Sequence, residues 1–353
     1  MCKFVEIIQA MHLYPGRSFG NLLKTVILLF SCILTPCMQN HASVSPRKYR
    51  TPVVFPADLF SLLINGDTPM GNFQSITIPL KRAGRLFLIE ARIDDQEGNL
   101  IFDTGATELV LNRTYFRKYA AREKPTGGGV TGTTNKVSRI SVKRLQISDL
   151  YYENLRADLC DLGHIENRRG VKILGLFGLN MITGFEVVFD ARNSQLQLNR
   201  VDRNGNRLNP APSGIKYDFT QNMETMNSIL VLKGKIGEKF LSFVLDTGAE
   251  TNVINKHSSK NVLRTIQITH RTSLGGVDAA NVEVLSGTMN DFKLGNHQLG
   301  PMETIVTDLD AMSESYGRTI DGMLGFEFWQ KGIFCINFNK NEMSFSLGKG
   351  VNK

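Results

Sequence analysis

The residues that could carry chemistry in this chain are two aspartates in a repeated four-residue motif. Asp103-Thr104-Gly105-Ala106 recurs as Asp246-Thr247-Gly248-Ala249, 143 residues further along the chain. Two carboxyl groups that share one proton can hydrolyse an amide bond together. The ionised group takes a proton from water, and the protonated group hydrogen-bonds the carbonyl oxygen. The motif therefore makes Asp103 and Asp246 the candidate catalytic pair.

The sequence around the two motifs repeats as well. Each aspartate ends an apolar run, Leu100-Ile101-Phe102 in the first copy and Phe243-Val244-Leu245 in the second. Val110-Leu111-Asn112 and Val253-Ile254-Asn255 then follow at the same offset. A single motif of this kind is weak evidence, whereas two copies with matching flanks indicate an internal repeat.

A β-hairpin is expected to deliver each aspartate. In the first copy, residues 86–93 are a strand candidate, and a polar turn through Asp94–Asn99 precedes the strand that ends at Asp103. In the second copy, strands are expected at 229–236 and 240–245, around a turn at Gly237-Glu238-Lys239.

A glycine-rich stretch follows each aspartate and is a candidate flap over a cleft. Glycines between β-forming residues are typical of a mobile hairpin tip. An ordinary surface turn is the alternative. The candidate flap residues are Gly128, Gly129 and Val130 in the first copy and Gly275, Gly276 and Val277 in the second.

Each copy closes with two apolar residues and a glycine. Leu176-Phe177-Gly178 corresponds to Met323-Leu324-Gly325, with the glycine 75 and 79 residues after its aspartate. Further strands are expected up to 195–198 in the first copy and 344–347 in the second. The body of the protein is therefore predicted to be all-β, with few short helices.

Composition divides the chain into five segments. The apolar run at 26–34 has the length of a secretory signal core and is short for a bilayer span. We therefore expect an exported protein, periplasmic or extracellular, with a lipid anchor at Cys37 as an alternative to signal-peptide cleavage. The expected segments are a targeting segment at 1–42, a linker or short pro-segment at 43–74, an N-terminal lobe at 75–200, an interlobe linker at 201–214 and a C-terminal lobe at 215–348.

Charge and residue spacing argue against several other functions. The net charge of +8 is spread along the 353 residues, which indicates a solvated basic surface and no nucleic-acid partner. The six histidines show no paired spacing, and Cys160 and Cys335 fit no zinc motif, so no metal and no cofactor are expected. Arg168-Arg169 before Gly170 is interpreted as an exposed loop.

The combined pattern resembles the aspartyl proteases of the retropepsin and pepsin clan. Two apolar residues, Asp-Thr-Gly-Ala, a glycine-rich stretch and a final apolar-apolar-Gly occur twice between about residues 75 and 348. The resemblance implies two retropepsin-like β-barrel lobes related by pseudo-twofold symmetry, each contributing one aspartate. It also extends to protease-like proteins that bacteria export.

The resemblance assigns supporting roles to the other motif residues. The hydroxyls of Thr104 and Thr247 are expected to hydrogen-bond across the lobe junction. Gly105 and Gly248 allow a tight turn close to the carboxylate, and small residues at Ala106 and Ala249 stay out of its way. The sequence departs from the family pattern at Thr107, Glu250, Leu179 and Phe326. These departures leave the aspartate pair intact and concern the substrate preference.

The expected function is that of an aspartic endopeptidase acting on a polypeptide substrate. One chain is expected to supply both aspartates as an intramolecular pseudo-dimer, with pairing of lobes from two chains as the alternative. A secreted peptide-binding or scaffold protein without turnover is the alternative function.

Overall fold

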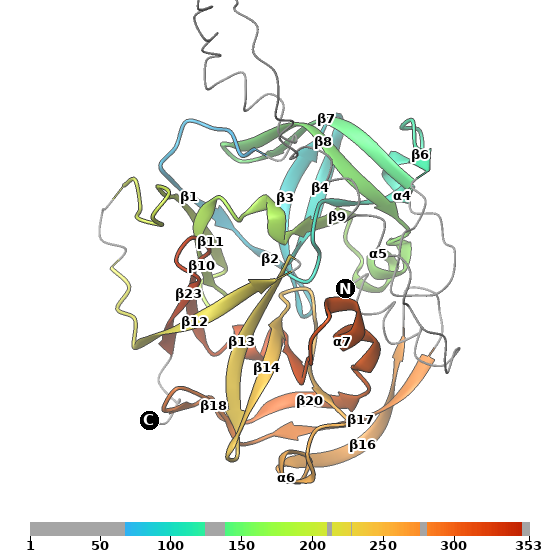
Figure 1. The fold of residues 1–353 in the computed structure, drawn as a ribbon. Coiled ribbons are helices and arrows are strands. Elements are labelled where there is room, and N and C mark those ends of the chain that lie inside the picture. Colours follow the sequence, from blue (N-terminus) through green and yellow to red (C-terminus); the bar gives the residue numbers. More distant parts are fainter. Residues whose placement is uncertain (1–67, 124–137, 210–213, 227, 276–280, 348–353) are drawn as a thin grey trace, which may run out of the picture. The chain divides into compact units, whose positions relative to one another are not determined.

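The computed structural model describes residues 68–123, 138–209, 214–226, 228–275 and 281–347 (Figure 1). The expected targeting segment and most of the 43–74 segment lie outside the described residues. So do five of the candidate flap residues, Gly128, Gly129, Val130, Gly276 and Val277. Within the described part of the chain, no helix is long and apolar enough to cross a membrane.

The first half of the described chain forms an eight-stranded sheet that closes on itself. The strand order is β2-β3-β4-β9-β5-β8-β7-β6, and an additional pairing of β3 with β7 completes a barrel. The strands are β2 (Lys81–Ala83), β3 (Leu86–Ile93), β4 (Gln96–Asp103), β5 (Val110–Asn112), β6 (Arg122–Glu123), β7 (Ser138–Ile147), β8 (Leu150–Cys160) and β9 (Ile173–Gly178).

The second half repeats this arrangement. Its strands run in the order β13-β14-β21-β15-β20-β17-β16, and β18 pairs with β13 as β7 pairs with β3. The strands are β13 (Ile229–Ile236), β14 (Lys239–Leu245), β15 (Asn252–Asn255), β16 (Ile266–Gly275), β17 (Asn281–Met289), β18 (Phe292–Leu294), β19 (His297–Gln298), β20 (Met302–Thr307) and β21 (Gly322–Leu324).

Six further strands join the two halves in the order β1-β11-β10-β22-β23-β12. At the centre, β10 of the first half pairs with β22 of the second, with Val188 opposite Cys335. The backbone hydrogen bonds of this pair therefore cross from one half to the other. The strands are β1 (Ser75–Pro79), β10 (Phe185–Asp190), β11 (Gln195–Arg200), β12 (Phe219–Met226), β22 (Gly332–Asn337) and β23 (Glu342–Leu347).

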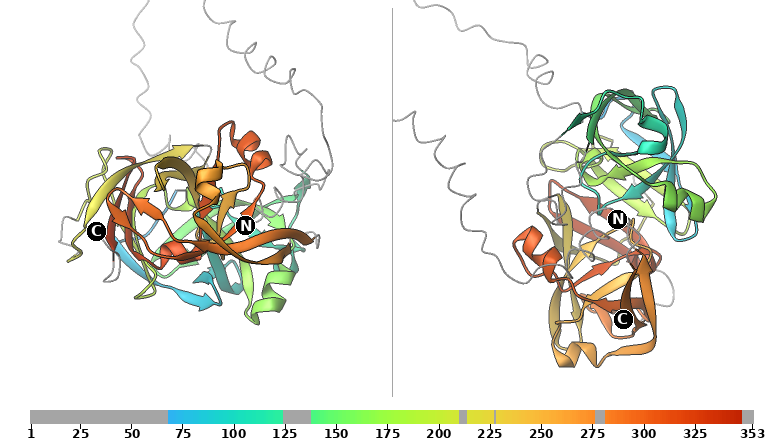
Figure 2. Two further views of the ribbon diagram at one scale, coloured as in Figure 1. Left: turned by 90° about the horizontal axis from the view of Figure 1, so that it is seen from below. Right: turned by 90° about the vertical axis from the view of Figure 1, so that its right-hand side faces the viewer.

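The helices are short, and the expected all-β fold with few helices is confirmed. In the right-hand view of Figure 2, the barrel strands of the first half (blue to green) lie at one end, and those of the second half (orange) lie at the other. The helices are α4 (Arg113–Phe116), α5 (Gly163–Arg169), α6 (Lys260–Leu263), α7 (Asp310–Tyr316) and α8 (Phe326–Trp329), with a 3₁₀ turn η1 at Leu179–Met181.

Aromatic side chains fill the space where the two halves meet. The ring centroid of Phe87 lies 5.5 Å from that of Phe326, and the Phe189 centroid lies 5.2 Å from that of Trp329. Each of these pairs joins one residue of the first half to one of the second. Burying such large rings provides several kcal/mol of hydrophobic stabilisation, so the halves share one continuous apolar core.

The first hairpin turn is shorter than the sequence indicated. We expected a polar turn over Asp94–Asn99, but β4 already begins at Gln96, which leaves Asp94 and Asp95 as the turn. Asp94 has a φ of 52°, a left-handed conformation that aspartate tolerates. Its Oδ1 also accepts a hydrogen bond from the backbone N–H of Arg144 at 2.8 Å. This tertiary contact favours the tight turn and could not be anticipated from local composition.

Candidate active site

Each aspartate lies at the C-terminal end of an inner strand that pairs in parallel with its neighbour. Strand β4 runs parallel to β9, with Asp103 opposite Gly178, and β14 runs parallel to β21, with Leu245 opposite Leu324. Asp103 and Asp246 therefore leave equivalent strands at equivalent points. Both side chains are buried, with exposed fractions of 0% and 1%.

Backbone N–H groups fix the orientation of each carboxyl group. Asp103 Oδ1 accepts hydrogen bonds from Gly105 N at 2.9 Å and Ala106 N at 3.2 Å. In the second loop, Asp246 Oδ1 accepts from Gly248 N at 2.7 Å and Ala249 N at 3.1 Å. Because each Oδ1 is occupied by two donors of its own loop, Oδ2 is the oxygen left for other partners.

The two threonines cross-link the loops through four hydrogen bonds. Thr104 Oγ1 donates to Leu245 O at 2.9 Å and accepts from Thr247 N at 3.0 Å. Thr247 Oγ1 in turn donates to Phe102 O at 2.7 Å and accepts from Thr104 N at 3.0 Å. Each hydroxyl thus satisfies two backbone groups of the other half, as the resemblance implied. The interactions are almost entirely shielded from solvent, which strengthens them.

The two glycines face the opposite carboxyl groups. A Cβ atom at Gly105 would lie 2.5 Å from Asp246 Oδ2, and a Cβ atom at Gly248 would lie 2.6 Å from Asp103 Cγ. No side chain fits at these distances, so glycine is required in both loops by the approach of the carboxyl group across the junction. The geometry therefore places Asp103 and Asp246 next to each other.

Two further glycines let a buried strand pass directly behind each loop. A Cβ atom at Gly178 would lie 2.3 Å from Glu108 O, and one at Gly325 would lie 2.6 Å from Ala249 O. The residue after each glycine hydrogen-bonds to the motif alanine: Leu179 N donates to Ala106 O at 2.8 Å, and Phe326 N donates to Ala249 O at 2.9 Å. Both loops are thus backed by protein on the side away from the junction.

The environment of the pair favours a shared proton. Burial, together with the neighbouring Asp103, raises the pKa of Asp246 to about 7. Asp246 Oδ2 is buried and accepts no hydrogen bond from an N–H group of the described residues, and its polar neighbour is the carboxyl group of Asp103. Two adjacent carboxyl oxygens in such a place are compatible only if one of them carries a proton. The pair as a unit is therefore expected to hold one proton into the near-neutral range.

Tyr316, the last residue of α7, was missed by the sequence analysis. Its side chain is buried in an apolar cluster that includes Ala249 and Met323. Burial, followed by the charges of Asp246 and Asp103, raises the pKa of Tyr316 to about 12. The phenol therefore lies within electrostatic reach of both aspartates and stays neutral at physiological pH. The repeat could have pointed to this position, because Tyr316 and Gly317 occupy the places of Arg169 and Gly170 in the first copy.

The interpretation of Arg168-Arg169 as an exposed loop is wrong, because both residues lie in helix α5, and only Arg168 is exposed. Arg169 ends helix α5, and its side chain is only 18% exposed because its guanidinium forms an ion pair with Glu250 of the second half. Arg85 makes further contacts in the same region. Local sequence did not reveal these contacts, since the partners are 81 and 165 residues away.

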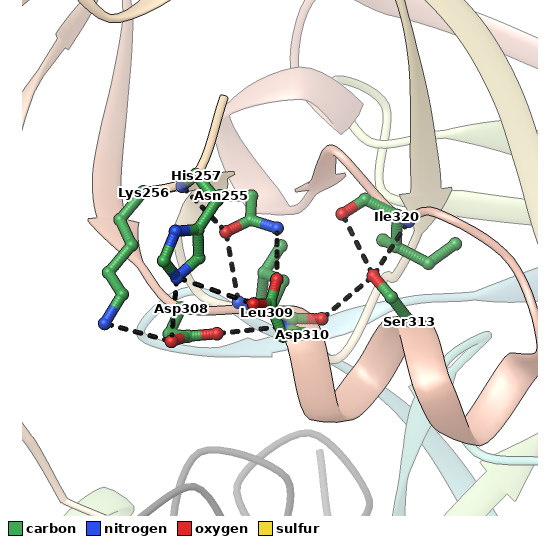
Figure 3. Close-up of polar contacts among 8 residues, drawn as sticks. All are labelled: Asn255, Lys256, His257, Asp308, Leu309, Asp310, Ser313 and Ile320. Atoms are coloured by element: carbon green, nitrogen blue, oxygen red, sulfur yellow. Dashed lines mark hydrogen bonds and ion pairs between the residues drawn. The ribbon is translucent and has the colours of Figure 1, made fainter. Parts of the chain in front are cut away.

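One cluster of described residues could hold a metal ion. His257, Asp308 and Asp310 place their donor atoms within 4.8 Å of one another at the start of α7 (Figure 3). However, the Lys256 ammonium group lies 2.9 Å from Asp308 Oδ2 and already balances part of the negative charge. Asn255 ties the two segments together, since its Oδ1 accepts from His257 N and Leu309 N. We therefore interpret the cluster as a set of ion pairs that fixes the first turn of α7.

Removing one threonine hydroxyl tests how strongly the junction depends on it. In a Thr104→Val protein, Leu245 O loses its donor and Thr247 N loses its acceptor, both in a buried place. Each unsatisfied group costs about 1–3 kcal/mol, so we expect the free energy of unfolding in urea to fall by about 2–6 kcal/mol. A Thr104→Ser protein keeps the hydroxyl and serves as the control. Equal stability of the valine variant and the wild type would contradict this account of the junction.

Comparison with known proteins finds the same pattern twice in the chain. The family model described as aspartyl protease matches residues 89–181 and again 232–328, which together make up more than half of the chain. Each match includes one Asp-Thr-Gly-Ala motif and the glycine that backs it.

Individual relatives are distant. The retrovirus-related Pol polyprotein from transposon 412 of Drosophila melanogaster is 24% identical over 131 residues, which is 37% of this chain and 10% of that polyprotein. A retropepsin-like aspartic protease from Rickettsia conorii is 20% identical, with a TM-score of 0.27 over 38% of this chain and 94% of that one. An aspartic proteinase from Irpex lacteus is 10% identical, with a TM-score of 0.44 over 78% of this chain and 98% of that one.

Proposed function

The chain belongs to the aspartyl protease family, and we propose that it is an aspartic endopeptidase whose two aspartates activate one water molecule. The family and the all-β fold support a protease function in general. The observation that carries the finer proposal is the approach of the two loops. Gly105 and Gly248 each face the opposite carboxyl group at a distance that excludes any side chain.

The proposed reaction uses the two carboxyl groups in different protonation states. The ionised group accepts a proton from the water molecule as the water attacks the carbonyl carbon of the substrate. The protonated group hydrogen-bonds the carbonyl oxygen and supports the charge that develops there. Proton transfer to the amide nitrogen then allows the C–N bond to break, and the pair returns to its singly protonated state. Asp103 and Asp246 share these roles as a unit.

The backbone hydrogen bonds at each Oδ1 contribute preorganisation. Four N–H groups, two in each loop, hold the carboxyl groups before substrate arrives, so little reorganisation is needed during the reaction. The threonine cross-link serves the same purpose, because it fixes one loop relative to the other. We propose that Thr104 and Thr247 act as positioning residues in this sense.

The proposed substrate is an extended polypeptide that lies across the two aspartates. Protease clefts often bind such a segment like an added strand, with backbone hydrogen bonds giving affinity and side chains giving selectivity. The hairpin of β16 and β17 supports one candidate flap, since it is paired up to Gly275 and Asn281. Most residues of both candidate flaps lie outside the described part of the chain, and their role over the substrate stays a prediction.

We propose that both aspartates of one site belong to the same chain. The pairing of β10 with β22 and the threonine cross-link support this arrangement, because each joins the first half to the second. The site would then require no second copy of the protein.

A peptide-library assay tests the proposal. The purified chain is incubated with a mixture of unstructured peptides, with and without pepstatin, and the products are identified by mass spectrometry. Internal cleavage that the inhibitor blocks is the expected result. The assay covers pH 3 to 8, which is roughly the span over which a carboxyl pair titrates. Saturable binding of peptides without cleavage at any of these pH values would contradict the proposed endopeptidase activity and indicate a peptide-binding protein.

The pH dependence of cleavage follows from the shared proton. At low pH both carboxyl groups are protonated and no base is left, whereas at high pH both are ionised and the acid is lost. Because the pKa of Asp246 is raised to about 7, we expect the value of kcat/KM to fall as the pH rises above about 7. A profile that still rises beyond this point would show that the pair does not hold its proton as described.

A further inference from the structure

A group of five charged residues connects the two halves beside the aspartate loops. This interlobe clasp consists of two arginines of the first half and three glutamates of the second: Arg85, Arg169, Glu250, Glu303 and Glu327. Arg169 pairs with the Glu250 carboxylate. Arg85 Nη1 donates to Glu250 O at 3.3 Å, and Arg85 Nη2 lies 2.5 Å from Glu303 Oε2 and 3.8 Å from Glu327 Oε1. Every one of these contacts crosses between the halves.

The clasp is connected to the Asp246 loop through very few bonds. Glu250 directly follows Ala249, whose N–H donates to Asp246 Oδ1 at 3.1 Å. The carbonyl of Ala249 accepts from Phe326 N at 2.9 Å, and the guanidinium of Arg85 lies 5.8 Å from the centre of the Phe326 ring. A displacement of Glu250 would therefore be passed to the backbone that orients Asp246.

The repeat places no such pair of charged residues at the equivalent positions of the first aspartate loop. Arg169 and Tyr316 are the last residues of α5 and α7, and each is followed by a left-handed glycine with a φ of 64° or 65°. Thr107 and Glu250 are equivalent in the same way, as the residues after Ala106 and Ala249. At the second loop, Glu250 pairs with Arg169 at the end of α5. At the first loop, the equivalent positions are Thr107 and Tyr316 at the end of α7. The two aspartate loops are therefore supported by different chemistry.

The Arg169–Glu250 pair is shielded enough to be energetically significant. The two side chains are only 18% and 25% exposed, and ion pairs in such places are screened less by solvent than surface pairs. Arg169 Nε is buried and makes no hydrogen bond to the described residues, so Glu250 is an important compensating partner for this guanidinium. Removing either partner would leave the other charge poorly compensated.

We propose that Arg85 and Arg169 are positioning residues that hold the Asp246 loop against the first half through Glu250. The proposal rests on the proposed endopeptidase function and adds that the second aspartate loop is held to the opposite half by an ion pair, whereas the ion pair at the first loop, Glu108 with Arg139, stays within its own half. A shift of about 1 Å in a reacting group can cost up to 100-fold in rate. Loosening the clasp should therefore lower kcat more than it raises KM.

Charge removal and charge exchange test the proposal in the full-length chain. The Arg169→Gln and Glu250→Gln proteins are each expected to lose roughly tenfold in kcat while KM changes less than about twofold. The single reversals Arg169→Glu and Glu250→Arg should be worse. The double reversal, which restores opposite charges, should recover at least half of the lost log kcat. Rescue by exchange identifies the pairing itself as the cause.

A second ion pair of similar burial provides the matched control. Arg207 and Glu186 are 16% and 13% exposed and pair on strand β10 and the segment after β11. Glu186 also accepts hydrogen bonds from Asn199 and Asn337, which lie outside the two aspartate motifs. The Glu186→Gln protein should lose thermal stability but keep kcat within about twofold, the scatter expected where the reacting groups are undisturbed.

The thermal midpoints of the same proteins separate failure of this proposal from failure of the proposed function. If the wild type cleaves peptides but kcat is unchanged in Arg169→Gln and Glu250→Gln, the positioning role is overturned. Folded charge-exchange proteins without any recovery of kcat overturn it as well. If the wild type cleaves nothing, the endopeptidase proposal fails, and the positioning role in that reaction fails with it. A higher midpoint for the double reversal than for both single reversals would then show only that the clasp joins the two halves.

Discussion

The Asp103→Asn and Asp246→Asn proteins are each expected to lose peptidase activity by roughly 10³-fold or more. An amide cannot take a proton from water as a carboxylate does, and the pair then lacks either its base or its acid. Both residues are buried and lie next to each other beside the two glycines, so either variant leaves the remaining carboxyl group without its partner. The measurement is kcat/KM on a fluorogenic peptide chosen from the library, for both variants and the wild type.

The same Asp246→Asn substitution should stabilise the protein at neutral pH. The folded pKa of Asp246, about 7, lies above the usual value of 3.8. The folded state therefore binds more protons than the unfolded state between these values, and wild-type stability falls as the pH rises from about 4 to 7. Asparagine has no such titration. Its advantage in the free energy of unfolding should grow across this interval to at most about 4 kcal/mol and disappear in acid.

A second buried aspartate serves as the control for both effects. Asp190 is 7% exposed, and its carboxylate accepts hydrogen bonds from Arg192 N, Asn193 N and Asn193 Nδ2. The Asp190→Asn protein should lose stability and keep its activity, the reverse of the Asp246→Asn protein. Equal losses of activity in the two proteins would mean that buried aspartates matter here only for folding.

Gly248→Ala is expected to reduce kcat/KM by roughly 100-fold or more. The added Cβ would lie 2.6 Å from Asp103 Cγ and 2.6 Å from Asp103 Oδ1. Carbon atoms do not approach each other so closely, and the atoms in the way belong to a buried carboxyl group held by two backbone donors. The loops would have to separate, which disturbs the hydrogen bonds between Thr104 and Thr247. The thermal midpoint should therefore fall together with activity.

Gly184→Ala is the matched control for this substitution. A Cβ at Gly184 would meet its nearest neighbour, Pro69 Cγ, at an ordinary contact distance of 3.7 Å. This variant should keep both activity and stability. If Gly248→Ala behaved in the same way, the close approach of the two aspartate loops would be incorrect.

The repeated motif predicted which strands end at Asp103 and Asp246, because this pattern is visible in the neighbouring residues of the sequence. Asp103 and Asp246 end apolar strands in hairpins, and strand periodicity is visible in the residues themselves. Gly178 and Gly325 could be found in the same way, since they recur at similar distances from the aspartates. The strand bounds at Leu86–Ile93 and Ile229–Ile236 agree with the expected ones for this reason.

The contacts between the halves could not be predicted in this way. The pairing of Val188 with Cys335 joins residues that share no local pattern, and either strand could have formed a different pair. The same holds for Arg169, which looks like a surface residue next to Arg168 and is recognised as an interlobe residue only through Glu250. Long-range ion pairs carry no periodic signal in sequence.

The central claim is that one chain supplies both aspartates of a site, and one complementation experiment tests it most directly. The Asp103→Asn and Asp246→Asn chains carry different affinity tags and are produced together in one cell. Two preparations are assayed for peptide cleavage: the mixture of both chains, and the fraction that is retained on both tags in succession. If each site is built from one chain, neither preparation contains an intact pair, and both should remain inactive. Recovery of a quarter or more of wild-type activity (about the fraction expected if halves of different chains combine freely) would show that aspartates from two chains meet.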